Sequence, residues 1–180
     1  MKFIFIGPSG AGKGTFAEIF KDKGIQRSIS STTRTPRKWE KEGIDYFFLE
    51  QNEKTKIKMI ESPAYDDNHR DVWYFTTKDQ FEKEKNIYCE MSKKGIDDLK
   101  QYYGKDNIKV IYVYCKPEEA FERIRDRNGE EYALKRNYSN YKEGSFDDFE
   151  LADLVIMNTN ESNMNLNKWI LKSFIEFYMD

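Results

Sequence analysis

The chain has 180 residues, a formal net charge of −2 and a charged fraction of 34%. This length suits one α/β core and is too short for two full domains. The near-neutral charge balance provides no broad cationic field, so nucleic acid is not the expected partner. We find no apolar run near the roughly 20 residues of a membrane span, and we expect no signal peptide because the first residues have the pattern of a strand. We therefore expect a single-domain cytoplasmic protein that binds no membrane.

The first motif is the stretch Gly7-Pro8-Ser9-Gly10-Ala11-Gly12-Lys13-Gly14-Thr15. It follows the apolar run Phe3–Ile6 and precedes Phe16–Phe20, whose apolar residues recur at helical spacing. Strand, glycine-rich turn and helix form the context of a P-loop. Backbone N–H groups of such a loop converge on phosphate oxygens, and the charge of Lys13 can follow a β- or γ-phosphate. The stretch predicts a nucleotide phosphate site.

The residue after Lys13 is Gly14, where many P-loop proteins carry the Ser or Thr that binds Mg²⁺. Thr15 follows one position later. We therefore expect Mg²⁺ to be held mainly by nucleotide phosphates and water, with Thr15 and Glu90 as the candidate protein ligands.

Residues 25–30 are interpreted as a short strand, and the polar segment Ser30–Arg37 follows. Two guanidinium groups beside hydroxyls suit a second phosphate group, although an exposed basic turn is the alternative. Beyond it we expect a strand over Gly43–Leu49, a short helix over residues 50–62 and a hairpin over residues 63–77. Residues 30–77 would thus form a small, partly β insert.

The core is expected to resume with a helix from Thr77 to Lys85. The strands expected after it are Asn86–Met91, Lys109–Cys115 and Leu154–Met157, and the further helices are Gly95–Tyr103, one opened by Pro117, and Asn163–Met179. Strands that alternate with helices predict a parallel sheet covered on both faces. The terminal helix carries an apolar stripe at Leu166, Ile170, Phe174 and Phe177. Cys89 and Cys115 lie in apolar strands, where two buried thiols are expected rather than a disulfide.

A cationic stretch lies between the Pro117 helix and the last strand. Its members are Arg123, Arg125, Arg127, Lys135 and Arg136. Interleaved glutamates are compatible with a solvated helix face. The predominance of arginine favours a lid that closes over a transferring phosphoryl group.

Taken together, these motifs resemble the guanylate kinase family of P-loop enzymes, which pass a phosphoryl group from ATP to GMP. The resemblance covers nearly the whole chain. Its most specific parts are the P-loop, the segment Ser28–Arg37 and the sequence Gly43-Ile44-Asp45-Tyr46. The resemblance implies a P-loop NTPase-type three-layer α/β/α fold with a parallel core sheet, a small mixed α/β insert that binds the nucleoside monophosphate, and a helical lid. The expected division is a core of residues 1–29, 78–125 and 145–180, an insert of 30–77 and a lid of about 126–144.

The resemblance also implies residue roles. On the donor side the P-loop and Asn158 would bind ATP, with Asn158 on the adenine side. On the acceptor side the implied phosphate ligands are Ser30, Arg34, Arg37, Tyr46 and Tyr74. Thr76 matches the hydroxyl residue that contacts guanine, and Glu90 is the remaining carboxylate of a family motif that reads Tyr88-Cys89-Glu90 here. The expected catalytic residues are Lys13, Arg34, Arg127 and Arg136.

The carboxylate that reads the guanine edge has several candidates. An ungapped alignment places Tyr65 there, whereas pairing the hairpin about Asn68-His69 places Glu61 opposite Thr76, and Asp66 is a further candidate. Phe75 replaces a glycine of the family pattern, and the lid is slightly short.

The expected function is phosphoryl transfer from ATP to GMP or dGMP, with Mg²⁺ as cofactor and a monomer or homodimer as the working form. The alternatives are a kinase of the same fold with another phosphorylated acceptor, and a non-catalytic module that binds phosphopeptides.

Overall fold

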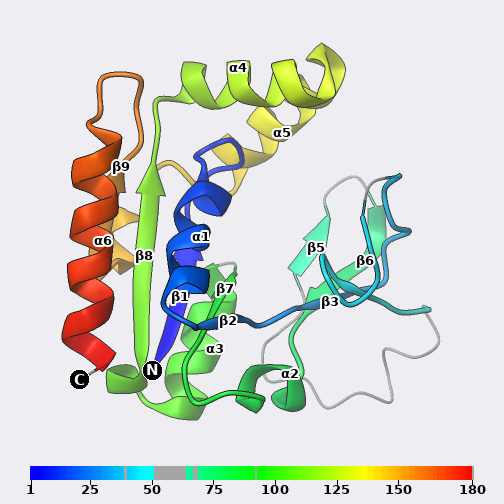
Figure 1. Ribbon diagram of the computed structural model, residues 1–180. Coiled ribbons are helices and arrows are strands. Elements are labelled where there is room, and N and C mark those ends of the chain that lie inside the picture. The colour runs from blue at the N-terminus through cyan, green and yellow to red at the C-terminus, as the bar shows by residue number, and fades with distance from the viewer. Residues whose placement is uncertain (39, 51–63, 67–68, 92, 180) are drawn as a thin grey trace.

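The computed structural model describes residues 1–38, 40–50, 64–66, 69–91 and 93–179 (Figure 1). Its core sheet has the strand order β2-β7-β1-β8-β9, and all the pairings are parallel. The strands are β1 (Lys2–Ile6), β2 (Gln26–Arg27), β7 (Ile87–Glu90), β8 (Ile108–Tyr114) and β9 (Leu154–Met157). The buried strands β1 and β8 are nearly continuous apolar runs, as parallel strands covered on both faces require.

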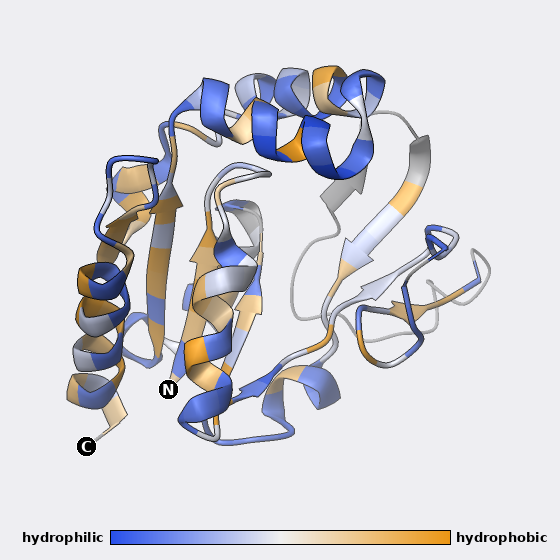
Figure 2. Cartoon of the chain, turned by 45° about the horizontal axis from the view of Figure 1, so that its top comes forward, coloured by the Kyte–Doolittle hydropathy of each residue, from blue (hydrophilic) through white to orange (hydrophobic). Residues whose placement is uncertain are grey.

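Helices cover both faces of this sheet. On one face α1 (Lys13–Asp22) and α6 (Met164–Met179) pack against Phe3 and Phe5 of β1. On the other face α2 (Lys78–Glu82) and α3 (Lys93–Tyr103) pack against Ile4 and Ile6. Figure 2 shows the apolar strands between helices whose outer faces are largely hydrophilic. The expected three-layer arrangement with a parallel core sheet is confirmed.

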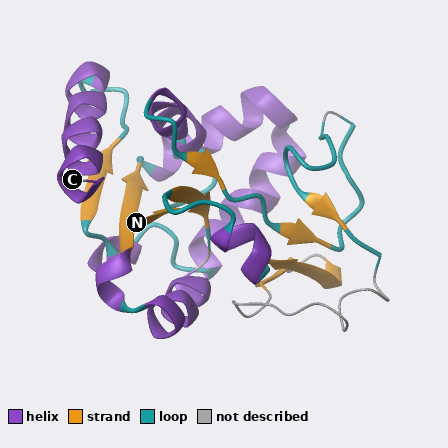
Figure 3. Cartoon of the chain, turned by 60° about the horizontal axis from the view of Figure 1, so that its bottom comes forward, coloured by secondary structure: helices purple, strands orange, loops and turns teal. Residues whose placement is uncertain are grey.

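A second, smaller sheet lies beside the core (Figure 3). Its strand order is β4-β3-β6-β5, and its pairing is mixed. The strands are β3 (Ser31–Thr32), β4 (Phe47–Phe48), β5 (Ala64–Asp66) and β6 (His69–Phe75). The hairpin expected over residues 63–77 is therefore present as β5 and β6. The helix expected over 50–62 falls almost entirely on residues 51–63, which lie outside the described residues.

Two helices lie above the carboxyl ends of the core strands (Figure 1). Helix α4 (Pro117–Asn128) begins with the proline at its first turn, and α5 (Glu130–Lys142) follows after Gly129. Because Gly129 has a φ of 86°, the chain reverses there within one residue. Short 3₁₀ turns at Lys105–Asn107 and Asp148–Leu151 complete the described elements.

Three elements are clearly shorter than expected. The strand expected over residues 25–30 is limited to β2, Gln26–Arg27. For the other two, the structure shows an identifiable cause. The helix expected to reach Lys85 ends at Glu82, where Lys2 Nζ donates to the carbonyls of Phe81 and Glu84, each at 2.8 Å. The strand expected over Gly43–Leu49 is limited to β4, because the Gly43 N–H is used in a turn with the Tyr46 carbonyl at 2.9 Å. In both of these elements another contact takes backbone groups that a longer element would need: a distant lysine at the end of α2, and a local turn before β4.

The expected apolar stripe of the terminal helix is wrong at Leu166 and Phe177 and correct at Phe174. Leu171 and Ile175 are the buried residues of α6, and Phe174 packs beside them, whereas Phe177 is 76% exposed and Leu166 is also exposed. Apolar residues occur around most of this helix, so spacing alone could not determine which face meets the sheet.

Cys89 and Cys115 are both buried and are not joined in a disulfide, as expected. Burial raises the pKa of Cys115 to about 11. In the described part of the chain, none of the helices has the length and apolar character needed to cross a membrane.

Candidate active site

The P-loop connects β1 to α1 and lies at the carboxyl end of the middle strand of the core sheet. Gly12 adopts a φ of 88°, and a Cβ there would lie 2.4 Å from Nδ2 of Asn158. Gly10 has a φ of 89°, and a Cβ there would lie 2.6 Å from the Ala120 carbonyl oxygen of α4. Both positions therefore require glycine for conformation and for close approach. Thr15 is exposed at the start of α1.

Lys13 folds back over the loop that precedes it. Its ammonium donates to the carbonyls of Gly7 at 2.9 Å and Pro8 at 3.0 Å, and its Nζ lies 3.9 Å from a carboxylate oxygen of Glu90. Burial lowers the pKa of Lys13, and the charge of Glu90 opposes that shift. This leaves a largely desolvated cation over the loop, where its charge acts with little screening.

Asn158 lies behind the P-loop. Its Nδ2 donates to the Ala11 carbonyl at 2.7 Å, and the residue is buried. The structure thus places it against the loop backbone, and the expected adenine contact remains a prediction. Ala11 is itself buried in the core, so its side chain anchors the loop and does not face the cavity.

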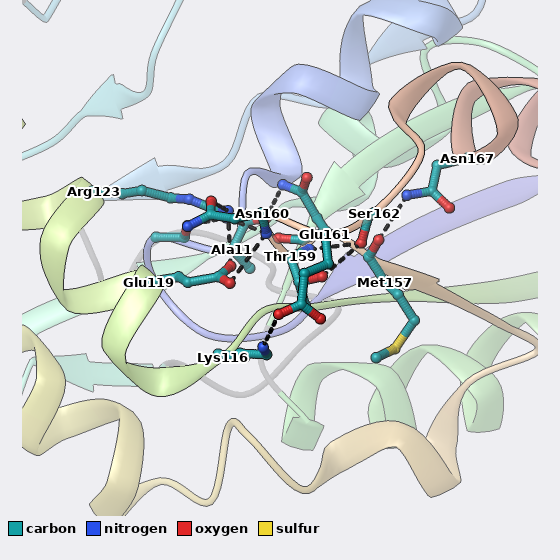
Figure 4. A network of polar contacts seen from close by, with 12 residues as sticks. Ala11, Lys116, Glu119, Arg123, Met157, Thr159, Asn160, Glu161, Ser162 and Asn167 are labelled. Atoms are coloured by element: carbon teal, nitrogen blue, oxygen red, sulfur yellow. Dashed lines mark hydrogen bonds and ion pairs between the residues drawn. The ribbon is translucent and has the colours of Figure 1, made fainter.

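A polar network joins α4, the P-loop and the segment after β9 (Figure 4). The Arg123 guanidinium donates to the Asn158 carbonyl at 3.0 Å, to the Gly10 carbonyl at 3.4 Å and to Glu119 at 3.1 Å. The Glu119 carboxylate also accepts from the Asn160 N–H at 3.1 Å. The network fixes the position of α4 against the loop.

A cavity of about 630 Å³ opens above the P-loop. Its lining comes from the loop, the insert, β7 and the helices α4 and α5, with the segment after α5. The lining residues are Gly7, Ser9, Gly10, Gly12, Lys13, Gly14, Arg34, Arg37, Tyr46, Tyr74, Glu90, Arg123, Arg127, Tyr132, Arg136, Ser139, Asn140, Glu143 and Ser145. Thirteen of these were expected as site residues from the sequence.

Arg34 is held by several contacts within the insert. Its two terminal nitrogens donate to the Glu40 carboxylate at 2.8 and 2.9 Å, and its Nε donates to the Tyr74 hydroxyl at 2.9 Å. The guanidinium also lies 5.6 Å from the centre of the Tyr46 ring. Burial opposes the shift, but these bonds raise the pKa of Arg34 and lower that of Glu40. The Arg34 guanidinium is therefore held in one orientation before any ligand binds.

Arg37 is held from two directions. The Glu40 carboxylate accepts from the Arg37 backbone N–H at 2.7 Å, and the side chain donates through Nη2 to the Tyr132 hydroxyl of α5 at 2.9 Å. Burial is the main cause that raises the pKa of Tyr46, which lies beside Tyr74 in the same wall. The insert and α5 therefore meet at this corner of the cavity.

Ser30 and Thr76, two further predicted residues, are not among the lining residues. The Ser30 and Thr76 hydroxyls bond each other at 2.9 Å, and Thr76 is buried. Glu61 lies outside the described residues, and for Asp66 only the backbone, in β5, is described. The roles proposed for these residues remain predictions.

The cationic stretch divides into two groups. Arg125 and Lys135 pair with carboxylates of their own helices, Asp126 at 3.3 Å and Glu131 at 2.8 Å, which is the solvated-face arrangement. Arg127 and Arg136 line the cavity together with Arg123.

Sequence reasoning missed several residues of this site. Glu40 follows Arg37 by three residues, a spacing that could have suggested an arginine partner. Arg123 was noted only as part of a charged run. Tyr132 contacts Arg37, 95 residues away, and Asn140 contacts Ser9, 131 residues away. No local sequence pattern predicts such contacts.

Two cationic regions face each other across one cavity, one at the P-loop and one in the insert. Such a pair suits a reaction between two phosphorylated molecules, so the fold and the site define a P-loop nucleotide phosphotransferase. Residues 1–177 match the family model described as guanylate kinase. The chain therefore belongs to the guanylate kinase family.

Individual relatives agree with this assignment. The chain is 36% identical over 150 residues to a guanylate kinase of Mycoplasma pneumoniae, a match that covers 75% of this chain and 59% of that protein. It is 32% identical over 164 residues to a guanylate kinase of Fusobacterium nucleatum, covering 87% and 86%. The crystal structure of guanylate kinase from Anaplasma phagocytophilum superposes with a TM-score of 0.65 at 21% identity, over the whole of this chain and 87% of that one. This superposition supports the fold.

Proposed function

We propose that the protein transfers the γ-phosphoryl group of ATP to GMP or dGMP and releases ADP and the nucleoside diphosphate. The observation that carries this proposal is the single cavity with the P-loop on one wall and the Arg34–Glu40–Tyr74 cluster on another. A site for one nucleotide would not need the second group of cations.

On the donor side, the P-loop N–H groups and Lys13 would bind the β- and γ-phosphates of ATP. Lys13 would exchange its bonds to the Gly7 and Pro8 carbonyls for phosphate oxygens, which are stronger partners because they are charged. Asn158 and Arg123 keep the loop backbone in place from behind.

On the acceptor side, Arg34 and Arg37 would bind the phosphate of the nucleoside monophosphate, with the hydroxyls of Tyr46, Tyr74 and Ser30 as further partners. Glu40 is the residue that orients the arginines, because it contacts both of them. The acceptor phosphate is already an anion near neutral pH, so the reaction requires no general base.

During transfer, the bond from the γ-phosphorus to the β-phosphate oxygen breaks and a bond to an acceptor phosphate oxygen forms. Arg127 and Arg136 line the cavity from above, where they would stabilise the equatorial oxygens of the transferring group. The protein mainly aligns the two phosphates and neutralises their charge.

Mg²⁺ would supply further charge neutralisation when bound with ATP. Among the described residues, no group of three or more His, Cys, Asp or Glu side chains could hold a metal ion alone. The exposed Thr15 hydroxyl and the Glu90 carboxylate are the oxygen donors that this chain would add to those of the nucleotides.

An acceptor panel tests the proposal. ADP release is measured with ATP and, in turn, GMP, dGMP, AMP, UMP and CMP. We expect turnover with GMP and dGMP. The Lys13→Ala variant should turn over at least about 100-fold more slowly than the wild type, at an unchanged melting temperature. Lys172→Ala, which removes an exposed lysine of α6, is the matched control.

The other outcomes identify the alternatives. Turnover with a different acceptor would indicate a kinase of the same fold with another substrate. Binding of nucleotides or phosphopeptides without turnover would indicate a non-catalytic module. Normal turnover of Lys13→Ala would refute the donor-site assignment.

A further inference from the structure

Helix α5 contacts both walls of the cavity. Near its carboxyl end, the Asn140 amide oxygen accepts from the Ser9 N–H at 3.0 Å, and its Nδ2 donates to the Ser9 carbonyl at 3.2 Å. Asn140 is buried, with 2% of its surface exposed. This two-point pairing fixes α5 to the P-loop, and Arg136 lies one turn earlier on the same helix.

Near its amino end, α5 reaches the acceptor wall through Tyr132. The Tyr132 hydroxyl accepts from Arg37 Nη2 at 2.9 Å, and the Arg37 guanidinium carbon lies 5.6 Å from the centre of the Tyr132 ring. Ring and hydroxyl thus contact the same cation, and both side chains line the cavity.

The two arginines of the insert are therefore held differently. Arg34 takes its partners from the insert itself, namely Glu40, Tyr74 and the Thr35 carbonyl. Arg37 is farther from the Glu40 carboxylate, at 3.6 Å, and is more exposed. Its closer side-chain contact is the one made by α5.

We propose that Tyr132 is a positioning residue for the acceptor phosphate, which holds the Arg37 guanidinium at the cavity and links it to the helix that carries Arg136. This inference rests on the proposed function. A guanidinium has five N–H donors, and the Tyr132 hydroxyl accepts one of them, so Arg37 retains donors for a phosphate. Holding the long side chain in place reduces the conformational entropy lost when the phosphate binds.

The contact also links the two substrates. Because α5 is tied to Ser9 at one end and to Arg37 at the other, a ligand that orders either wall favours the position of α5 that the other wall requires. A bound ATP analogue should therefore tighten GMP binding through α5.

Steady-state kinetics of Tyr132→Phe test the first part. This variant removes the hydroxyl and keeps the ring, so the fold should persist with an unchanged melting temperature. We expect a three- to tenfold higher KM for GMP and an unchanged KM for ATP, with a larger rise for Tyr132→Ala. Tyr138→Phe is the matched control, since Tyr138 lies on the same helix and is 69% exposed. A lower KM for GMP would mean that Tyr132 competes with the phosphate, and an unchanged KM would remove it from the site. Either result overturns the proposal.

A double-mutant comparison and a binding measurement complete the test. In an Arg37→Ala background, Tyr132→Phe should have no further effect on the KM for GMP. Calorimetry should show that a non-hydrolysable ATP analogue lowers the Kd for GMP in the wild type. In Tyr132→Phe, the factor by which the analogue lowers this Kd should be at least threefold smaller. Equal tightening in both proteins would overturn the coupling.

The activity of the wild type distinguishes a failure of the proposed function from a failure of the role of Tyr132. A wild type inactive with every acceptor would overturn the proposed function and this inference together. An active wild type, assayed with the acceptor that it prefers, combined with a normal Tyr132→Phe would overturn only the role of Tyr132.

Discussion

Replacing Glu40 by glutamine tests how the acceptor arginines are held. The Glu40 side chain is 6% exposed and Arg34 is 13% exposed, so their bidentate pair is largely shielded from water. A glutamine keeps one acceptor oxygen but turns an NH₂ group toward either Arg34 or the Arg37 N–H, which are both donors.

The magnitude follows from the contacts that remain. Breaking a buried ion pair costs about 3–5 kcal/mol, and losing a hydrogen bond to a charged group about 1.5–3 kcal/mol. Arg34 keeps the Tyr74 hydroxyl and the Thr35 carbonyl, so the lower range applies. We expect Glu40→Gln to lower the free energy of unfolding by about 2 kcal/mol and to raise the KM for GMP about tenfold, with the KM for ATP unchanged.

The pH dependence supplies an independent check. The native partners lower the pKa of Glu40, so its contribution to stability is present above the unfolded-state pKa of about 4.3 and is lost as the pH falls through the lower native value. Urea unfolding curves of the wild type and Glu40→Gln should therefore differ at pH 7 and converge under acidic conditions.

Glu122→Gln, which changes an exposed carboxylate of α4, controls for the loss of one negative charge. Equal stability and equal KM for GMP in wild type and Glu40→Gln would refute the positioning role. A stability difference that persists unchanged to acidic pH would refute its electrostatic origin.

Two further predictions concern the P-loop and the thiols. Gly12→Ala should lower the melting temperature and raise the KM for ATP at least tenfold, because its Cβ would lie 2.4 Å from the Asn158 amide and its φ is 88°. Gly14→Ala is the paired control: its Cβ would meet nothing within 4 Å, so stability should stay the same or rise by up to about 1 kcal/mol. Native Cys89 and Cys115 should resist a thiol reagent at pH 8 and react upon unfolding, because both are buried and the pKa of Cys115 is raised to about 11; rapid reaction of the folded protein would contradict this.

The elements of the core were predictable from the sequence because their signals are local. Strands β1 and β8 are apolar runs bounded by turn residues, and Pro117 marks the first turn of α4. Two of the errors occur where a distant group decides the outcome. The end of α2 depends on Lys2, 79 residues from Phe81, and the buried face of α6 depends on its contacts with α1 and β9.

In the site, too, the locally encoded features were predictable and the long-range contacts were not. A phosphate-binding loop is specified by a short run of glycines and one lysine. The acceptor arginines, Arg34 and Arg37, are three positions apart in one segment. Both features were therefore visible in the sequence. The positioning contacts are long-range: Asn158 meets Ala11 across 147 positions, and Asn140 meets Ser9 across 131. Side chains of these types are common on any surface, and only the fold distinguishes them.

Helix α5 is where these long-range contacts converge. It has no apolar stripe as clear as those of core helices, and its buried residues include Ser139 and Asn140. A helix with polar residues on its inner side gains little from burial and depends on the partners that it meets. Besides α4, which packs along it, those partners are Ser9 in the P-loop and Arg37 in the insert, so the stability of α5 in this position is tied to the geometry of both walls. A helix held in this way can respond to either substrate, which a helix fixed by a large apolar face could not do without breaking the core.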